Sequence, residues 1–304
     1  MFFLFLAIFS SSAIALIFKY SETSRMNRYA VTSANYFAAV LTSGIILSVR
    51  GILVPKELDL IDALKQLSES MSSESIMISR ESSFVWAVIV GLCAGGFFFL
   101  AFIYYQISVR NHGVGLSGAF AKLGILVPML LSLLFWKEYP SQVQWLGIIL
   151  AIFSIVIVNW PKKKSLKNAI RLSLLLLFLF GGISEFSNKV FQKYGLQDHR
   201  ALFLFINFSI AFAFSIVTTV NKQIPIKKRD LVTGILVGVP NLFSSYFLIM
   251  ALDKIKAAVV FPIYSAGTIV VINLVGLLLF KERLKKLEIS AIILVIISLV
   301  LINL

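Results

Sequence analysis

Hydrophobic residues along this chain form long runs that short polar segments separate. A helix needs about 20 consecutive apolar residues to cross the hydrocarbon core of a bilayer, and ten runs approach that length. The predicted membrane-spanning segments cover residues 1–19, 29–48, 84–107, 113–136, 142–160, 169–191, 200–220, 230–252, 257–280 and 286–303. These runs are too long and too continuous for the alternating strands of a membrane barrel. The pattern therefore predicts an all-α polytopic membrane protein with ten transmembrane helices.

The second half of the chain repeats features of the first. A shift of 144 residues aligns Phe135–Glu138 with Leu279–Glu282 and Ile157–Asn159 with Leu301–Asn303. Near the start of each half, a larger shift aligns Asn35–Tyr36 with Asn207–Phe208. The repeat predicts two halves of five helices each, residues 1–160 and residues 165–304. Most of their difference in length lies in residues 49–82, a polar segment that we expect to form a surface loop, either alone or with a short amphipathic helix. Because five is odd, the halves must enter the membrane from opposite sides, as the inverted repeats of secondary transporters do.

Three segments of the second half carry a family resemblance. They are Tyr246–Leu252, Ala257–Pro262 and Leu279–Glu282, and the first half has a weaker version of the last one that ends in Lys137–Glu138. Together with the helix count, these segments resemble EamA-type members of the drug/metabolite transporter superfamily. The resemblance implies a ten-helix basket around a central substrate pathway, lined mainly by helices one, three, four, six, eight and nine. It does not specify a substrate.

The composition supports the membrane class. The chain is 59% hydrophobic and only 14% charged, with a mean hydropathy of +0.94, whereas soluble domains carry about 25% charged residues. The net charge of +14 comes mostly from basic residues in the connections between apolar runs. Such residues hold loops on one side of a bilayer, so we expect no nucleic-acid partner. The single cysteine, Cys93, excludes a disulfide framework and a thiolate metal site.

The orientation of the chain has two conflicting indications. The connections on the side of both termini carry 9 lysine and arginine residues, and those on the opposite side carry 17. The positive-inside rule then places both termini outside the cell. The family resemblance instead implies termini in the cytoplasm. We follow the charge count.

Few ionisable residues lie within the predicted spans, and such residues mark functional sites by default. Lys122 lies midway along the fourth span, with no acidic residue on its own helix to neutralise it. In the sixth span, Glu185, Asn188 and Lys189 share one helical face. They are predicted to line a substrate pathway. The alternative is a local ion pair between Glu185 and Lys189 that only fixes helix packing.

A second polar stripe lies in the eighth span. Gly234 and Gly238 have the spacing of a helix-packing motif, while Asn241 follows a proline and is expected to face the pathway. Tyr104 and Tyr264 could supply aromatic and hydroxyl contacts to a substrate, or equally lie at a membrane interface or a helix contact. The substrate-binding residues predicted from the sequence are therefore Tyr104, Lys122, Glu185, Asn188, Lys189, Asn241 and Tyr264.

Several other kinds of chemistry are not expected. The pattern G-x-G-x-x-G at residues 113–118 opens a membrane helix, without the strand that a nucleotide site requires. His112 and His199 are too far apart in sequence to argue for a metal pair. The chain has no P-loop and no catalytic motif, so we predict no catalytic residues, no cofactor and no metal.

These observations favour a secondary transporter of a small polar, zwitterionic or anionic metabolite, resembling an amino acid, that works by alternating access. The buried charges of Lys122, Glu185 and Lys189 sum to +1, which favours a substrate with an anionic group. The alternatives are a non-transporting membrane scaffold and a membrane-embedded enzyme. The expected partners are the substrate and the lipid bilayer of the plasma or inner membrane. We expect a monomer or a homodimer.

Overall fold

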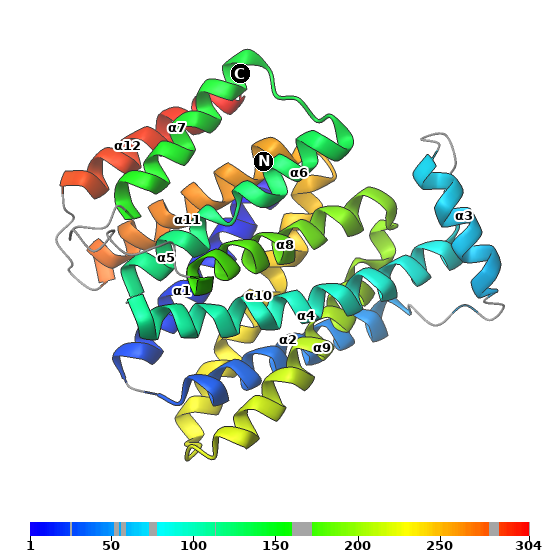
Figure 1. Ribbon diagram of the computed structural model, residues 1–304, viewed down its shortest axis with the longest axis horizontal. Helices are drawn as coiled ribbons and strands as arrows, with labels where there is room; N and C mark the ends of the chain where they lie inside the picture. The colour runs from blue at the N-terminus through cyan, green and yellow to red at the C-terminus, as the bar shows by residue number, and fades with distance from the viewer. Residues whose placement is uncertain are drawn as a thin grey trace. The chain divides into compact units, whose positions relative to one another are not determined.

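The computed structural model describes residues 1–24, 26–51, 55, 59–72, 78–112, 114–159, 172–279 and 286–303. Regular structure in these ranges is entirely helical (Figure 1). The α-helices are α1 (Phe2–Thr23), α2 (Arg28–Arg50), α3 (Leu60–Ser72), α4 (Arg80–His112), α5 (Val114–Leu123), α6 (Leu126–Trp136), α7 (Gln142–Asn159), α8 (Leu172–Tyr194), α9 (Arg200–Lys222), α10 (Lys228–Leu252), α11 (Ala257–Leu279) and α12 (Lys286–Asn303). A short 3₁₀ helix, Gln197–His199, precedes α9.

The helices agree closely with the predicted apolar runs. Five are long and apolar enough to cross a membrane: α2, the first 26 residues of α4, α8, α9 with the 3₁₀ helix before it, and α10. Shorter apolar stretches occur in α1, α6, α7 and α11. The predicted span 113–136 is divided into α5 and α6. The all-α membrane class is confirmed, while the count of ten spans in two inverted repeats stays a prediction.

The polar segment 49–82 contains one helix, α3. Its buried residues Ala63 and Leu67 pack against Val85 of α4, and the partly buried Trp86 joins the same cluster. Residues 52–54, 56–58 and 73–77 of this segment lie outside the described residues. The segment therefore contains a short amphipathic helix that packs against α4, which was one of the two forms expected for it.

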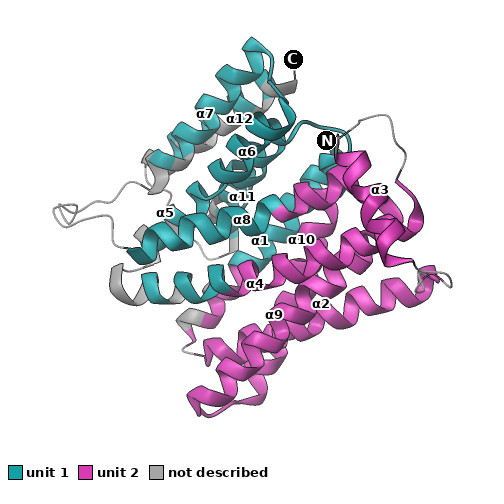
Figure 2. Cartoon of the chain, turned by 45° about the vertical axis from the view of Figure 1, so that its right-hand side comes forward, with its two compact units in different colours: residues 1–15, 100–186, 250–304 teal, residues 16–99, 187–249 magenta. Residues whose placement is uncertain are grey.

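The chain forms two compact units, and each takes segments from both halves of the sequence (Figure 2). Unit 1 comprises residues 1–15, 100–186 and 250–304, and unit 2 comprises residues 16–99 and 187–249. In unit 1, α7 packs along α12, and α11 packs against α6, α7 and α12. Small residues allow this close packing, because Ala151 of α7 and Ala266 of α11 share a fully buried cluster. The boundaries of the two sequence repeats stay a prediction.

In unit 2, α2 and α9 lie side by side (Figure 1). The aromatic rings of Tyr36 and Phe208, which occupy equivalent positions in the two sequence halves, meet there with centroids 6.1 Å apart. On α4, a Cβ added to Gly95 would lie 2.5 Å from the Cβ of Ile210 and 2.6 Å from the backbone oxygen of Asn207. The α4–α9 contact therefore requires a residue without a side chain.

A matching contact joins α10 to α2. A Cβ added to Gly238 would lie 2.5 Å from the Cβ of Ala38, and one added to Gly234 would lie 2.5 Å from the Cβ of Ala34. Gly234 and Gly238 therefore serve close helix packing, which was one of the two interpretations of their spacing. Gly95 and Gly238 are separated by 143 residues, close to the shift of the sequence repeat.

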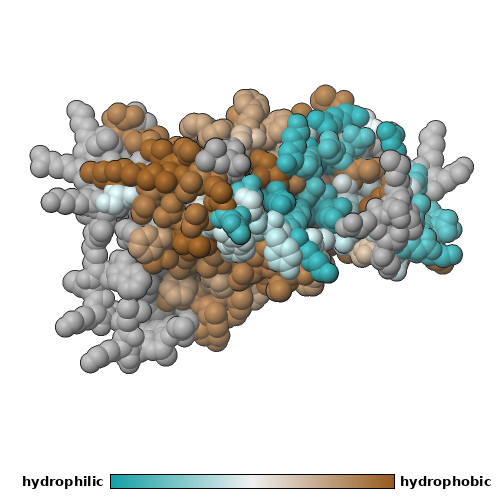
Figure 3. All heavy atoms as spheres, turned by 90° about the horizontal axis from the view of Figure 1, so that it is seen from above, coloured by the Kyte–Doolittle hydropathy of each residue, from teal (hydrophilic) through white to brown (hydrophobic). Residues whose placement is uncertain are grey.

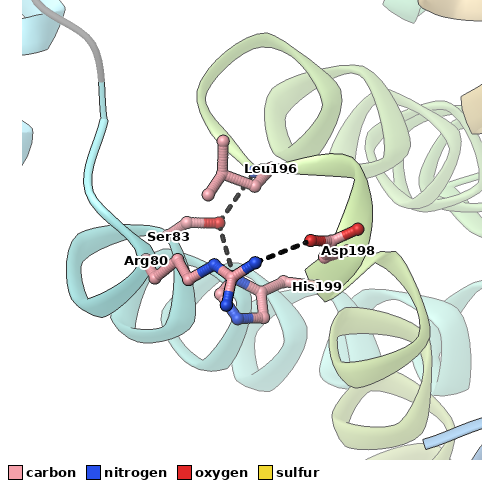
Figure 4. Close-up of polar contacts among 5 residues, drawn as sticks. All are labelled: Arg80, Ser83, Leu196, Asp198 and His199. Atoms are coloured by element: carbon pink, nitrogen blue, oxygen red, sulfur yellow. Dashed lines mark hydrogen bonds and ion pairs between the residues drawn. The ribbon is translucent and has the colours of Figure 1, made fainter. Parts of the chain in front are cut away.

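A polar cluster ties the start of α4 to the connection between α8 and α9 (Figure 4). The Ser83 hydroxyl accepts a hydrogen bond from the backbone N–H of Leu196 (2.7 Å) and is hydrogen-bonded to Nδ1 of His199 (2.8 Å). At its exposed edge, the Arg80 guanidinium lies 3.7 Å from the Asp198 carboxylate. His199 is buried, so its role here is to satisfy a buried serine and to hold two helix ends together.

Large hydrophobic side chains face outward from both units. On α2 of unit 2, Phe37, Leu41, Ile45 and Val49 are exposed at every fourth position and form one continuous stripe. On α12 of unit 1, the side chains described as exposed include Ile289, Ile293, Ile296, Ile297 and Val300. Figure 3 shows hydrophobic residues covering much of one face. Exposed apolar surface of this extent is typical of contact with lipid, and the protein is a multi-pass membrane protein.

Candidate substrate site

The fourth predicted span is broken immediately after Lys122. α5 ends at Leu123, α6 begins at Leu126, and Gly124 and Ile125 form a turn between them. Pro128 contributes to the break because it has no N–H to donate to the carbonyl oxygen of Gly124 four residues earlier. That oxygen instead accepts the N–H of Val127 at 3.0 Å. Discontinuous helices of this kind supply polar backbone groups to the binding sites of transporters.

Helix α8 approaches this break closely through Gly182. A Cβ added to Gly182 would lie 2.5 Å from the carbonyl oxygen of Gly124 and would overlap the Cβ of Val127. The neighbouring Gly181 faces open space, with no atom within 4 Å of such a Cβ. Residues four apart share one helix face. Glu185 therefore lies on the same face of α8 as Gly181, and both residues line the cavity at the break.

A small cavity of about 80 Å³ lies at the break, inside unit 1. It is lined by residues of α1, α5, the turn, α8 and α11: Ser11, Ala121, Lys122, Gly124, Ile125, Gly181, Glu185, Tyr264 and Ser265. Lys122 and Glu185 interact electrostatically as opposite charges, and each is half-buried. The partner that Lys122 needs within the membrane is therefore supplied by another helix.

The cavity has the groups to bind a small ionic ligand. The lysine ammonium can bind a carboxylate of a ligand, and the glutamate carboxylate can bind an ammonium group of a ligand. The hydroxyl-bearing residues Ser11, Tyr264 and Ser265 stand around them. Ser265 also donates a long hydrogen bond of 3.5 Å to the backbone oxygen of Lys122, which joins α11 to the break. The volume is well below the roughly 300 Å³ of a typical ligand pocket, so this conformation admits only a charged end group or a few water molecules.

Three other residues predicted for the site lie in unit 2. Asn188 and Lys189 are buried on the last part of α8, and the Lys189 ammonium donates a hydrogen bond of 2.9 Å to the Gln192 amide oxygen. Asn241 donates a hydrogen bond of 3.0 Å from Nδ2 to the amide oxygen of Asn35 on α2. Of these contacts, the one made by Asn241 joins two helices of unit 2, α10 and α2, whereas that of Lys189 lies within α8.

Tyr104 belongs to unit 1 but does not line the cavity. Its ring stacks on Phe180 of α8, with centroids 5.4 Å apart, which is the helix contact considered as one of its two interpretations. Of the seven predicted residues, the structure thus brings together Lys122, Glu185 and Tyr264 at one cavity. A single site made of all seven stays a prediction.

Sequence patterns did not indicate the two serines of the cavity, and they singled out Glu138 without indicating its role. The Glu138 carboxylate accepts the backbone N–H of Ala257 at 2.8 Å, and the Lys256 ammonium donates to the backbone oxygen of Tyr139 at 2.8 Å. These contacts fix the first turn of α11, the helix that carries Tyr264. The repeated motif at residues 281–282 lies outside the described residues.

Metal binding is not indicated by the described geometry. Within the described ranges, no three His, Cys, Asp or Glu side chains are grouped closely enough to hold a metal ion. The charged groups of the cavity are one lysine and one glutamate, and a lysine ammonium is not a metal ligand.

Comparison with known proteins finds a family similar to part of this chain. Residues 172–304 match the EamA-like transporter family. This confirms the resemblance that the sequence motifs indicated and supports a membrane transporter of the drug/metabolite transporter superfamily. Members of the EamA family are transporters rather than enzymes.

Two further similarities extend beyond the matched half. An uncharacterized protein of Haemophilus influenzae is 28% identical over 192 residues, which are 62% of this chain and 65% of the relative. This chain thus covers slightly less than two thirds of that relative's length. A solved crystal structure of another protein matches 99% of this chain and 94% of its own with a TM-score of 0.69 at 14% identity. That likeness shows a shared fold.

Proposed function

We propose that this protein is a secondary transporter that moves a small zwitterionic or anionic metabolite across the plasma or inner membrane by alternating access. The observation that carries the proposal is the pair of opposite charges, Lys122 and Glu185, at a cavity beside a broken apolar helix. Charged groups within membrane segments are expensive and usually serve function. A helix contact that needed only stability would be served as well by apolar side chains.

In this proposal each charge holds one end of the substrate. The Lys122 ammonium binds a carboxylate or another anionic group, and the Glu185 carboxylate binds an ammonium group or carries a coupling proton. Tyr264 and the serines offer hydroxyl groups to the uncharged polar atoms. Because the cavity of about 80 Å³ is too small for a whole metabolite, it represents a closed conformation of the site, which must widen when substrate enters.

Contacts inside each unit support the proposed alternation of ten spans in two inverted repeats. In unit 2, the connection between α1 and α2 meets that between α9 and α10 through Asn27 and Ile224. In unit 1, the connection between α6 and α7 meets that between α10 and α11 through Glu138 and Ala257. If ten spans cross the membrane in alternating directions, the two connections of each pair lie on the same side of the membrane.

The proposal is tested by a ligand screen followed by a transport assay. The purified full-length protein is heated with separate pools of amino acids, carboxylates, amines and neutral sugars, and ligands that raise its melting temperature are identified. We expect hits among zwitterions or anions, because binding to the native state stabilises it. The hits are then assayed for uptake into proteoliposomes. Hits that bind but never cross would indicate a sensor or scaffold, and chemical conversion of a hit would indicate an enzyme.

A further inference from the structure

A second cavity lies in unit 2, where Met26 and Asn27 meet the connection between α9 and α10. Asn27 organises this end of the unit. Its side-chain Nδ2 donates to the backbone oxygens of Ile224 (3.2 Å) and Pro225 (3.4 Å). Its Oδ1 accepts the N–H groups of Tyr29 and Ala30 and thereby caps α2. The two connections are thus held together by bonds to the backbone.

Asp230 completes this frame from the start of α10. Its carboxylate accepts the backbone N–H of Asn27 (3.3 Å) through one oxygen and that of Lys227 (2.8 Å) through the other. The residue is only 1% exposed. Its carboxylate also lines the cavity, where its one negative charge is outnumbered by the basic side chains, and both of its oxygens accept backbone hydrogen bonds.

The cavity has a volume of about 460 Å³ and a basic lining. Arg28, Lys227 and Arg229 provide three positive charges to it, and Lys227 and Arg229 are exposed. A fourth basic residue, Lys222, is close to one lining residue, since its ammonium lies 5.9 Å from the centre of the Tyr29 ring. Such a lining is suited to an anion with several oxygen atoms, above all a phosphate group.

Exposed apolar surface begins directly beside these charges. Ile224, which lines the cavity, is 44% exposed. One turn before the cavity, α9 exposes Val217 and Val220, and one turn after it, α10 exposes Leu231 and Ile235. The basic cavity therefore lies at the end of two outward apolar helix faces. A soluble anion would make no use of these faces, whereas lipid chains would.

We propose that this cavity binds the phosphate headgroup of an anionic phospholipid, whose acyl chains lie on the exposed faces of α9 and α10. The site is distinct from the cavity at Lys122 and belongs to the other unit. Lysine and arginine near a membrane surface attract anionic lipids. The cavity adds a bounded space and fixed backbone geometry to that general attraction, so it discriminates a phosphate with a free negative charge from a zwitterionic headgroup.

The test is a lipid titration of the full-length protein in detergent, followed by native mass spectrometry. The probes are phosphatidylglycerol, phosphatidylethanolamine and soluble glycerol phosphate. The test variant carries Lys227→Gln and Arg229→Gln. The control variant carries Arg50→Gln and Lys65→Gln, which remove the same charge from exposed positions of unit 2 outside the cavity.

We expect the test variant to bind phosphatidylglycerol on the order of 10- to 30-fold more weakly than the parent protein, because two basic residues are lost. The control variant and the binding of phosphatidylethanolamine should be unchanged. Equal weakening in both variants would show that only overall charge matters and would overturn the proposal. So would competition by glycerol phosphate at millimolar concentration, which would identify a site for soluble anions. Equal melting temperatures without added lipid establish that both variants are folded.

Discussion

The α4–α9 contact provides a sharp test of helix packing, because two adjacent glycines on α4 differ in their surroundings. A Cβ on Gly95 would lie 2.5 Å from the Cβ of Ile210 and 2.6 Å from the backbone oxygen of Asn207. Neither atom belongs to the flexible end of a side chain, so α4 and α9 must separate by about 1 Å to reach ordinary van der Waals distance. A Cβ on Gly96 would meet no atom within 4 Å.

The comparison of Gly95→Ala with Gly96→Ala isolates this packing contribution. Both substitutions gain the same helix propensity, about 1 kcal/mol, so the gain cancels in the difference between them. Overpacking of a close contact costs about 1–3 kcal/mol. We therefore expect Gly95→Ala to be less stable than Gly96→Ala by about 1–3 kcal/mol.

The measurement is the free energy of unfolding of each variant in mixed micelles, titrated with a denaturing detergent. The parent protein is included so that the propensity gain of Gly96→Ala is seen directly. If Gly95→Ala proved as stable as Gly96→Ala, the close approach of α4 to α9 would be wrong. The same reasoning applies to α10, where Gly238 is the corresponding residue.

Three further predictions use other contacts. Replacing Glu138 with alanine removes the acceptor of the Ala257 N–H at the start of α11. This change should lower the free energy of unfolding by about 1 kcal/mol, and an unchanged value would contradict a capping role for Glu138. Ser83→Ala removes the hydroxyl that is hydrogen-bonded to the N–H of Leu196 and to Nδ1 of His199. It should lower the free energy of unfolding by about 1–3 kcal/mol in the same assay. An unchanged free energy would count against this polar cluster. Tags on both termini should react with an external label in intact cells if the charge count sets the topology, and protected tags would favour the opposite orientation.

Apolar runs alone located the helices of this protein. A long hydrophobic segment has few alternatives to a helix in a membrane, and α2, α9 and α10 begin and end within a few residues of their predicted bounds. The break in the fourth span was not predicted. Gly124 and Pro128 are present in the sequence, but many membrane helices tolerate both residues. The turn in this helix combines the missing N–H of Pro128 with the close approach of Gly182 on α8, and the second of these depends on packing between helices.

The candidate site was predictable residue by residue but not as a group. Lys122, Glu185 and Tyr264 were each identified because polar side chains in apolar runs are rare. Their partners depend on packing between helices far apart in sequence, which periodicity within one helix cannot show. That is why Lys189 was considered as the partner of Glu185: a spacing of four residues is the contact that a single helix reveals. The structure adds Lys122 as a charge that interacts with Glu185.

The central claim is that Lys122 and Glu185 bind the substrate rather than merely each other. Removing one of two interacting charges leaves the other without its partner, which costs about 3–5 kcal/mol when the pair is fully buried and less for this half-buried pair, whereas replacing both avoids that cost. The variant that carries both Lys122→Met and Glu185→Gln should therefore fold as the parent protein does. Lys65→Met, on the exposed surface of α3, is the matched control.

The most direct measurement is uptake into proteoliposomes of the ligand that the thermal screen identifies, for the parent protein, the double variant and the control. The melting temperatures and elution profiles of the three proteins are compared first, to establish that all are folded. We predict that the control transports normally and that the folded double variant shows no uptake and no stabilisation by the ligand. Normal uptake by the double variant would contradict the claim, because the two charges would then serve only the packing of α5 and α8.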